Sequence, residues 1–393
     1  MTVEHTRRAL VGLVAGSLAG CLEVGDGNGD PSAAADPDGF EIETVAEGLT
    51  NPWGLAFVPD SPRLLVTERP GRLVVVDREA GEYEPVEGTP AVDPAGQGGL
   101  LDVTVWPDGS ETWVYLTDSA ANEDGDTATH LGRGRLDPDA PRLDGFERLH
   151  VAEPFVDSSG HYGSRVVVGP DDAVYVTTGD RQFKNFGPEH VSQDTSNELG
   201  ATLRLAPDGS VPADNPFVDD PDVRDAIFSY GHRNAQGMTI HPETGAIWQS
   251  EHGEEDGDEL NVVEAGGNYG WPVATYGCRY GTDDPVGDRP DEREDTVEPV
   301  HHWPCGSGGF PPAGMTFYDG ESIEAWHGDL FVGNLAGQYL GRFEVDGTEV
   351  TEREPLLADR GWRIRDVEAA PDTGRLHVAV DSGDAPIVRL VPE

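Results

Sequence analysis

Lysine is almost absent from this chain: Lys184 is the only lysine among 393 residues. Arginine therefore carries nearly all of the positive charge. The 74 Asp and Glu residues far outnumber the 26 Lys and Arg residues, so the formal net charge is −48. Nucleic-acid binding is disfavoured, because phosphate contacts need clustered basic side chains. The acidic residues are spread along the chain, which indicates a halophilic protein whose self-repulsion is screened by high salt, with an ordinary acidic secreted protein as the alternative.

Cysteine is also scarce, with Cys21, Cys278 and Cys305 as the three examples. No Cys-x-x-Cys pair is present, so the sequence does not support a zinc site. If the chain is exported, Cys278 and Cys305 meet oxidising conditions. Their spacing is then compatible with a disulfide or with two free buried thiols, because sequence separation does not fix geometry.

The N-terminal apolar run, residues 9–18, is too short to span a bilayer. It follows Arg7-Arg8 and leads into Leu18-Ala19-Gly20-Cys21, so residues 1–21 are predicted to be a twin-arginine-type lipoprotein signal peptide. A generic signal peptide with an incidental cysteine is the alternative. Residues 22–38, rich in Gly, Asp, Pro, Ser and Ala, are predicted to be a flexible tether. We therefore expect an exported protein held at the extracellular face of the cell membrane by a lipid on Cys21.

A pattern of two apolar strands joined by a Pro-Asp-type turn recurs along the chain. In the first copy an apolar segment ends at Pro59-Asp60, and a second apolar segment follows at residues 64–68. Proline fixes φ at such a turn, and Asp or Gly closes it. Six copies of the first strand and its turn occur, at residues 53–60, 100–108, 164–171, 237–243, 314–319 and 366–372.

Short strands at regular spacing without helical periodicity predict an all-β protein. Six copies, each with room for four strands, predict a six-bladed β-propeller over residues 39–393. The strand-like residues at the two ends, 40–45 and 387–390, are predicted to pair in one blade and close the ring. A β-sandwich is the structural alternative, but it would not produce six related turns.

Polar, charged and glycine residues are concentrated in two segments, 229–237 and 251–271. Glycine lets backbone carbonyls approach a ligand closely, and carboxylate and carbonyl oxygens are the ligands that Ca²⁺ prefers. Arg233 next to Asn234 offers hydrogen-bond donors to an anionic or quinone-like ligand. These segments therefore predict a cofactor and metal site.

A histidine and an aspartate flank the third copy of the repeat. His161 precedes its first strand and Asp180 follows its second strand. A carboxylate in that position can fix the tautomer of the imidazole and raise its basicity, which would make an oriented general base. A structural histidine is the alternative, because the chain contains 12 histidines.

Taken together, these motifs resemble the soluble aldose sugar dehydrogenases that use pyrroloquinoline quinone (PQQ), the glucose/sorbosone dehydrogenase-like propellers. The resemblance runs from about residue 40 to the end of the chain. It is carried by residues 51–54, 96–102, 161–165, 179–180, 231–237, 251–253, 257–261, 268–272 and 363–367.

The resemblance implies oxidation of an aldose at its anomeric carbon to the lactone, with PQQ and Ca²⁺ as cofactors. His161 is similar to the base that takes the proton from the anomeric hydroxyl while hydride passes to the quinone, and Asp180 would orient it. Arg233 would stabilise charge that develops on the quinone oxygens. The other positions that match cofactor-contacting residues are Gln97, Asn234, Tyr280, Arg363 and Arg365. The alternative for Arg363 and Arg365 is that they form ordinary ion pairs, and the alternative for Tyr280 is simple packing.

The resemblance also implies two calcium sites. The backbone carbonyls of Gly253 and Glu254 match the ligands of a catalytic Ca²⁺ that would polarise the quinone as a Lewis acid. Glu259 and Tyr269 match a second, structural Ca²⁺ site. Trp303 resembles an aromatic residue on the substrate side.

Two positions depart from the family pattern. Relatives carry a lysine in the fifth-blade loop that helps to clamp the cofactor, whereas residues 333–338 read Gly-Asn-Leu-Ala-Gly-Gln here. The proline that follows the calcium-site glycine in relatives is Glu254 in this chain, a change that keeps the backbone carbonyl.

The favoured function is thus a membrane-tethered PQQ- and calcium-dependent aldose dehydrogenase that passes electrons to an external quinone or soluble redox protein. A nicotinamide enzyme is disfavoured, because no strand-linked Gly-x-Gly-x-x-Gly motif occurs. One alternative is a non-catalytic propeller that binds a sugar or a protein after loss of cofactor affinity, which the missing lysine favours. Another is a calcium-dependent lactonase, which would need a cluster of side-chain carboxylates on the channel axis.

Overall fold

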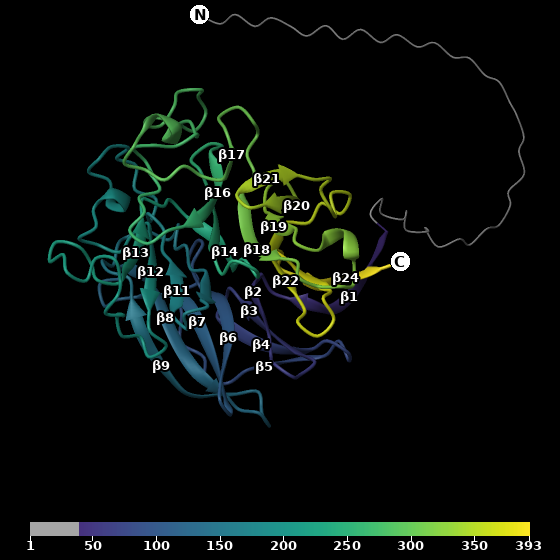
Figure 1. Cartoon of the computed structure of the whole chain (residues 1–393). Helices are drawn as coiled ribbons and strands as arrows, with labels where there is room; N and C mark the ends of the chain where they lie inside the picture. Colours follow the sequence, from purple (N-terminus) through teal and green to yellow (C-terminus); the bar gives the residue numbers. More distant parts are fainter. Residues whose placement is uncertain (1–38) are drawn as a thin grey trace, which may run out of the picture.

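Six four-stranded antiparallel sheets surround a common axis in the computed structural model, which describes residues 39–393 (Figure 1). The predicted all-β, six-bladed propeller is therefore confirmed. The predicted signal peptide (1–21) and tether (22–38) lie outside the described residues. No helix within residues 39–393 is long and apolar enough to cross a membrane.

Each copy of the sequence repeat forms the first two strands of one blade. The first strands contact one another around the ring and so line its axis. They are β2 (Pro52–Phe57), β6 (Leu100–Asp108), β10 (Val166–Val168), β14 (Ala235–Ile240), β18 (Pro312–Phe317) and β22 (Ile364–Ala369). The second strands are β3 (Arg63–Glu68), β7 (Glu111–Ala121), β11 (Val174–Thr177), β15 (Ile247–Glu251), β19 (Leu330–Asn334) and β23 (Leu376–Val380).

The outer two strands of each blade are more variable in length and in the loops that join them. They are β4 (Arg72–Asp77), β5 (Tyr83–Pro85), β8 (Thr127–Leu136), β9 (Leu143–Val151), β12 (Ala201–Leu205), β13 (Ile227–Tyr230), β16 (Asp258–Val263), β17 (His301–Trp303), β20 (Tyr339–Asp346), β21 (Glu349–Glu352), β24 (Ala385–Pro392) and β1 (Phe40–Leu49). Three short 3₁₀ turns lie in the connections: η1 (Val191–Gln193), η2 (Pro290–Glu292) and η3 (Glu324–Trp326).

The two ends of the chain close the ring, as the sequence predicts. β1 supplies the outermost strand of the last blade and pairs antiparallel with β24, with Phe40 opposite Pro392 and Thr44 opposite Val388. The N-terminal strand thus completes a sheet whose other three strands come from the C-terminus. This pairing covers the outer edge of β24 and gives the last blade four strands, as in the other five blades.

A buried charged cluster fills the middle of the channel. The Arg165 guanidinium lies 2.9 Å from the carboxylate of Asp102 and 3.0 Å from that of Asp366, so it joins the second, third and sixth blades. Gly314 leaves room for this cluster, because a Cβ there would lie 1.6 Å from Oδ1 of Asp366. Burial raises the pKa of Asp102 to about 7, with the Arg165 charge opposing that effect.

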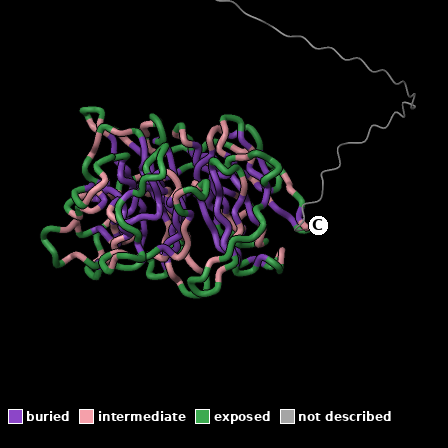
Figure 2. The backbone as a smooth tube through the Cα atoms, turned by 90° about the horizontal axis from the view of Figure 1, so that it is seen from above, coloured by how far each residue is buried: buried purple, intermediate pink, exposed green. Residues whose placement is uncertain are grey.

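The strand directions bring distant loops to one mouth of the channel. In an antiparallel pair, the start of the first strand and the end of the second strand lie at the same end. Segments that precede β6, β10, β14 and β22 therefore meet segments that follow β11, β15, β19 and β23. Figure 2 shows the buried strands between two layers of exposed loops.

Candidate active site

The loops at this mouth enclose a cavity of about 540 Å³. Nine of the residues that the sequence singles out line it, although they come from positions that span most of the chain. They are Gln97, His161, Arg233, Asn234, Gly253, Glu254, Tyr280, Arg363 and Arg365. The structure thus brings together nearly all of the predicted catalytic and cofactor-contacting side chains.

Asp180 lies directly behind His161. Nδ1 of His161 is 2.6 Å from Oδ1 of Asp180, and both side chains are buried. The other carboxylate oxygen accepts a hydrogen bond of 2.8 Å from the indole Nε1 of Trp271, and the Gln182 amide donates to Oδ1 at 2.9 Å. Because the carboxylate is held from several sides, the imidazole has a fixed orientation, and its Nε2 is left for the cavity.

The electrostatics of this pair favour a neutral imidazole facing an ionised carboxylate. Burial lowers the pKa of His161 below its ordinary value, while the hydrogen bond that its Nδ1–H donates to Asp180 opposes that shift. Burial tends to raise the pKa of Asp180, but the contacts with His161 and Arg233 outweigh it and lower that pKa. When the Nδ1–H of a neutral imidazole donates to Asp180, Nε2 carries no proton and can accept one.

The backbone at His161 adopts a left-handed conformation, with φ of 48°. Non-glycine residues seldom adopt it, and it is found where surrounding structure holds a functional side chain in place. The neighbouring chain at Gly179 is one such constraint, because a Cβ there would lie 2.1 Å from the His161 carbonyl oxygen. The amide of His161 also donates to Oε1 of Gln97 at 2.8 Å. Gln97 therefore supports the histidine as well as lining the cavity.

Arg233 and Asn234 occupy the floor of the cavity. One terminal nitrogen of Arg233 lies 2.8 Å from the Glu254 carboxylate, and its guanidinium lies over the Trp271 ring at 5.2 Å. The side-chain Oδ1 of Asn234 accepts a hydrogen bond of 3.2 Å from the Gly163 amide. This contact joins Asn234 to the segment that carries His161.

Arg363 and Arg365 share one acidic partner, Asp381. Arg365 donates to Asp381 at 2.9 Å and to the Gln236 side chain at 3.0 Å, and Arg363 lies 3.3 Å from the same carboxylate. The ion pairing that the sequence allowed for these arginines is thus present, yet both still line the cavity.

The donor set fits a polyanionic quinone. Within residues 39–393, the buried Nε atoms of Arg233 and Arg365 have no hydrogen-bond partner. A buried donor without a partner costs free energy, and an anionic ligand would remove that cost. The cavity is lined by four arginines, Arg69, Arg233, Arg363 and Arg365, which can pair with ligand carboxylates or with quinone oxygens.

The carbonyls of Gly253 and Glu254 suit a hard cation. Both residues line the cavity, and in the described part of the chain no hydrogen bond ends on either carbonyl oxygen. The Gly253 backbone is held by its amide, which donates to Asp258 at 2.9 Å. Within residues 39–393 there is no group of three or more His, Cys, Asp and Glu side chains arranged to hold a metal.

Glu259 and Tyr269 lie apart from the main cavity, around a small neighbouring cavity of about 10 Å³ that Glu251 also lines. Burial, together with the charge of Glu251, raises the pKa of Glu259 well above its ordinary value. The Tyr269 hydroxyl donates to the Val262 carbonyl at 2.6 Å, so its phenol is already engaged. A cation between the two glutamates would relieve their repulsion, which fits the predicted second site.

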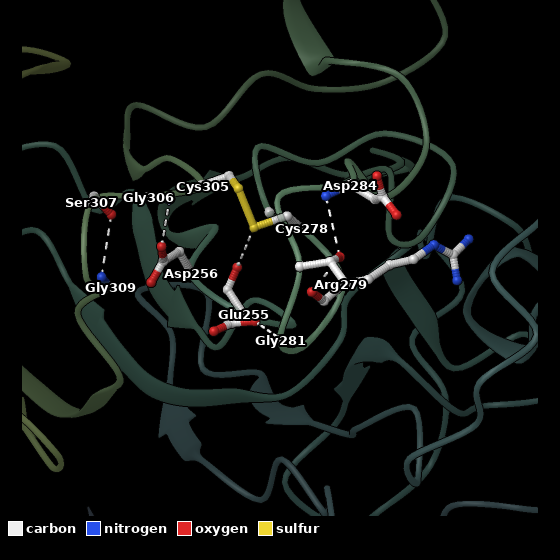
Figure 3. The surroundings of a disulfide bond; sticks show 12 residues. Glu255, Asp256, Cys278, Arg279, Gly281, Asp284, Cys305, Gly306, Ser307 and Gly309 are labelled. Carbon is white, nitrogen blue, oxygen red and sulfur yellow. Dashed lines mark hydrogen bonds between the residues drawn. A yellow bond between two sulfur atoms is a disulfide. The ribbon is translucent and has the colours of Figure 1, made fainter.

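Two cavity walls are joined by a disulfide between Cys278 and Cys305, whose Cα atoms are 5.4 Å apart (Figure 3). This resolves the choice that the sequence left open. Beside the bond, Asp256 accepts a hydrogen bond of 2.7 Å from the Gly306 amide. Tyr280, two residues after Cys278, stands at the rim with 63 % of its surface exposed. The disulfide therefore fixes the loop that presents Tyr280.

Trp303 does not fulfil the substrate-side role suggested for it. Its ring is buried in the core, stacked on Phe310 with a centroid distance of 4.5 Å, and it is not among the residues that line the cavity. The reason is its place in β17, where it pairs with Asp258 in the outer part of the blade. Its aromatic character reflects packing.

Several residues of the site carry no sequence signal strong enough to reveal their roles. Trp271, whose indole donates to Asp180, lies in the motif at residues 268–272, but the sequence predicts no role for it. Asp381 pairs with both Arg363 and Arg365. Acidic residues are so common in this chain that the sequence gives no reason to single out Asp381. Lys184 contacts the Glu254 side chain at 2.6 Å. The sequence feature that marks Lys184 is that it is the single lysine of the chain.

Comparisons with known proteins agree with this geometry. The family model described as "Glucose / Sorbosone dehydrogenase" matches residues 49–389. An aldose sugar dehydrogenase of Escherichia coli (strain K12), YliI, is 35% identical over 359 residues, which cover 91% of this chain and 94% of that protein.

Solved structures show the same architecture. The soluble aldose sugar dehydrogenase from Escherichia coli has a TM-score of 0.83 and 34% identity, over 90% of this chain and 100% of that one. The PQQ-bound form of an aldose sugar dehydrogenase from Streptomyces coelicolor has a TM-score of 0.72 and 28% identity, over 91% and 99%.

Fold, site and relatives define an oxidoreductase built on a six-bladed propeller. The chain belongs to the glucose/sorbosone dehydrogenase family.

Proposed function

We propose that this protein oxidises aldose sugars at the anomeric carbon to the lactone, with PQQ and Ca²⁺ as cofactors. The observation that carries the proposal is the His161–Asp180 pair, 2.6 Å apart at the wall of a cavity lined by Arg233, Arg363 and Arg365. The pair supplies an oriented base, and the arginines supply a cradle for an anionic quinone. A family relative of known structure was solved in a PQQ-bound form, which supports the same cofactor here.

Four residues of the chain would each have a separate role in this reaction. Nε2 of His161 takes the proton of the anomeric hydroxyl, and Asp180 stabilises the imidazolium that results. Arg233 places positive charge where negative charge develops during the reaction. Gln97 holds the His161 backbone so that Nε2 stays directed at the substrate. Bound PQQ would supply the oxidant, accepting the hydride that leaves the anomeric carbon, so the sugar loses one proton and one hydride.

The carbonyls of Gly253 and Glu254 would hold the catalytic Ca²⁺, which acts as a Lewis acid when bound. Glu259, with the backbone of Tyr269, would hold the structural Ca²⁺. The free carbonyls of the first pair and the crowded carboxylates near the second support these assignments.

We further propose that the enzyme works outside the cytoplasm, tethered through a lipid on Cys21, and that a quinone or a soluble redox protein takes its electrons. Detergent-phase partitioning tests the tether. Wild-type protein is expected in the detergent phase, whereas a Cys21→Ser variant is expected in the aqueous phase. Equal partitioning of the two would reject the anchor.

Dye-linked oxidation of a panel of aldoses, in molar salt and with or without PQQ and Ca²⁺, tests the function. We expect turnover that requires both additions and a loss of about 10²–10⁴-fold in kcat for His161→Ala. Turnover that persists without both cofactors, or full activity in the His161 variant, would reject the proposal. Binding of sugar with no turnover would identify a non-catalytic propeller instead.

A further inference from the structure

The only lysine of the chain lies beside the cavity and contacts two of the residues that line it, Glu254 and Tyr280. The Lys184 ammonium is 2.7 Å from one carboxylate oxygen of Glu254 and 2.6 Å from the other. The Glu254 carboxylate is buried, with 4% of its side chain exposed, whereas half of the Lys184 side chain is exposed. A half-exposed cation thus contacts a buried anion in the cavity wall.

Glu254 has two cationic partners. Its Oε2 also lies 2.8 Å from Arg233, whose own side chain is buried. This one carboxylate therefore has two cationic partners, one more than its own charge needs. Glu254 would keep a charge-assisted hydrogen bond to Arg233 if Lys184 moved away, so departure of the lysine would leave no buried carboxylate without a partner.

Lys184 can reach the cavity without disturbing the core. Its ammonium lies 5.4 Å from the ring centroid of Tyr280 and 5.6 Å from that of Phe186. Tyr280 lines the cavity and stands exposed at its rim. A lysine has a flexible four-carbon stem and a compact charge, so rotation of the stem can carry the ammonium across the tyrosine to a ligand.

The cavity is also lined by Arg69, whose side chain donates to the carbonyl oxygens of Gly96 and Gly98. From the segment that follows β19, the cavity receives Leu335 and Ala336. Arg363 and Arg365, farther along that side, share Asp381, so part of their charge is already matched. An anionic ligand with several carboxylates can therefore use an additional cation from the segment that carries Lys184.

We propose that Lys184 is a cofactor-binding residue that moves from Glu254 to an oxygen of the anionic quinone when the cofactor binds. The inference rests on the proposed function, because it takes PQQ as the ligand. Glu254 is the resting partner of Lys184 and, after the transfer, the partner of Arg233 alone.

Amine-selective labelling of the full chain tests the proposal directly, because Lys184 and the amino terminus are its only amines. Acetylation with an N-hydroxysuccinimide ester, followed by peptide mass spectrometry, reports the rate at each amine. We expect PQQ with Ca²⁺ to slow acetylation of Lys184 several-fold and to leave the amino terminus unchanged. Equal rates at Lys184 with and without saturating PQQ would overturn the proposal.

Cofactor affinity provides the second measurement, by quenching of tryptophan fluorescence during titration with PQQ. We expect Lys184→Gln to raise the Kd for PQQ by about 10-fold or more, as loss of a charge-assisted hydrogen bond does, and Lys184→Arg to restore part of the affinity. Arg279→Gln is the matched control. It removes one positive charge from the same rim, where Arg279 lies over Phe186 at 4.9 Å, and it should leave the Kd unchanged.

The outcomes separate this inference from the proposed function. If wild-type protein does not bind PQQ, both are rejected. If it binds PQQ but Lys184→Gln binds equally well, only the role of Lys184 is rejected. An equal loss of affinity in Lys184→Gln and Arg279→Gln would show a general charge effect and would also reject a specific contact.

Discussion

Nδ1 of His161 lies 2.6 Å from Oδ1 of Asp180, although one residue precedes β10 and the other follows β11. The antiparallel pairing of these two strands brings their ends together. Since the Asp180 hydrogen bond raises the pKa of His161 against the lowering effect of burial, the carboxylate sets both the orientation and the basicity of the imidazole.

Replacing Asp180 by Asn should therefore change the pH profile as well as the rate. We expect kcat to fall by about 10²–10⁴-fold. The acid limb of kcat/KM should move to lower pH, because the pKa of His161 loses the contribution that raises it. Steady-state kinetics from pH 4 to 8 measure both effects. Asp172→Asn, at an exposed turn in the same blade, serves as the control, and an acid limb that moves to higher pH would contradict the assignment.

Gly314 should be intolerant of any side chain. A Cβ at this position would lie 1.6 Å from the Asp366 carboxylate and 2.6 Å from Arg165. Gly314→Ala must displace the buried ion pairs that join three blades, so we expect a loss of more than about 3 kcal/mol in the free energy of unfolding. Denaturant titration measures it. Gly383→Ala, where a Cβ meets nothing within 4 Å, should be nearly neutral.

The Cys278–Cys305 disulfide should stabilise the fold and the cofactor site together. It closes a loop with a sequence separation of 27 residues, for which chain entropy predicts roughly 3 kcal/mol of stabilisation. A Cys278→Ser/Cys305→Ser double variant should lose about that much and should bind PQQ more weakly, because the loop that presents Tyr280 becomes less constrained. Unchanged melting in the double variant would show that loop closure contributes little.

Calcium should raise thermal stability through Glu259. Ligand that binds only the folded state stabilises it by about 2.7 kcal/mol at 100 times its Kd. We expect EDTA to lower the Tm and Ca²⁺ to restore it in wild-type protein, with a clearly smaller response in Glu259→Gln. Glu294→Gln, at an exposed site, should respond as wild type does. Calorimetry with and without Ca²⁺ gives the comparison, and equal responses in all three proteins would rule out a calcium ligand at Glu259.

Salt should stabilise the whole molecule. A formal charge of −48 produces repulsion that acts over a Debye length of about 8 Å at physiological ionic strength and about 3 Å at 1 M. We expect the Tm to rise steadily with KCl up to molar concentrations. Sucrose at equal osmolality is the control, since it acts by exclusion from the surface without screening charge. A Tm that responds equally to both would point away from electrostatic screening.

The blade repeat could be predicted because its signals are local. Each copy carries its own apolar strands and its own Pro-Asp turn, as at Pro59-Asp60, so neighbouring residues alone define it. Apart from the two terminal strands, the outer strands were not predicted individually, because strands such as β5 and β17 are short and their loops vary in length. Their pairing depends on the inner strands that they cover.

The sequence by itself determined the fold class, the closure of the ring and most of the residues at the cavity, because strand patterning and dense polar motifs are properties of short segments. Only the tertiary structure decided which side chains meet across blades. It joined Cys278 to Cys305, placed Lys184 on Glu254, and turned Trp303 into the core rather than toward a substrate. Those contacts depend on how the blades and the loops that connect their strands are arranged around the axis, and no spacing along the chain encodes that arrangement.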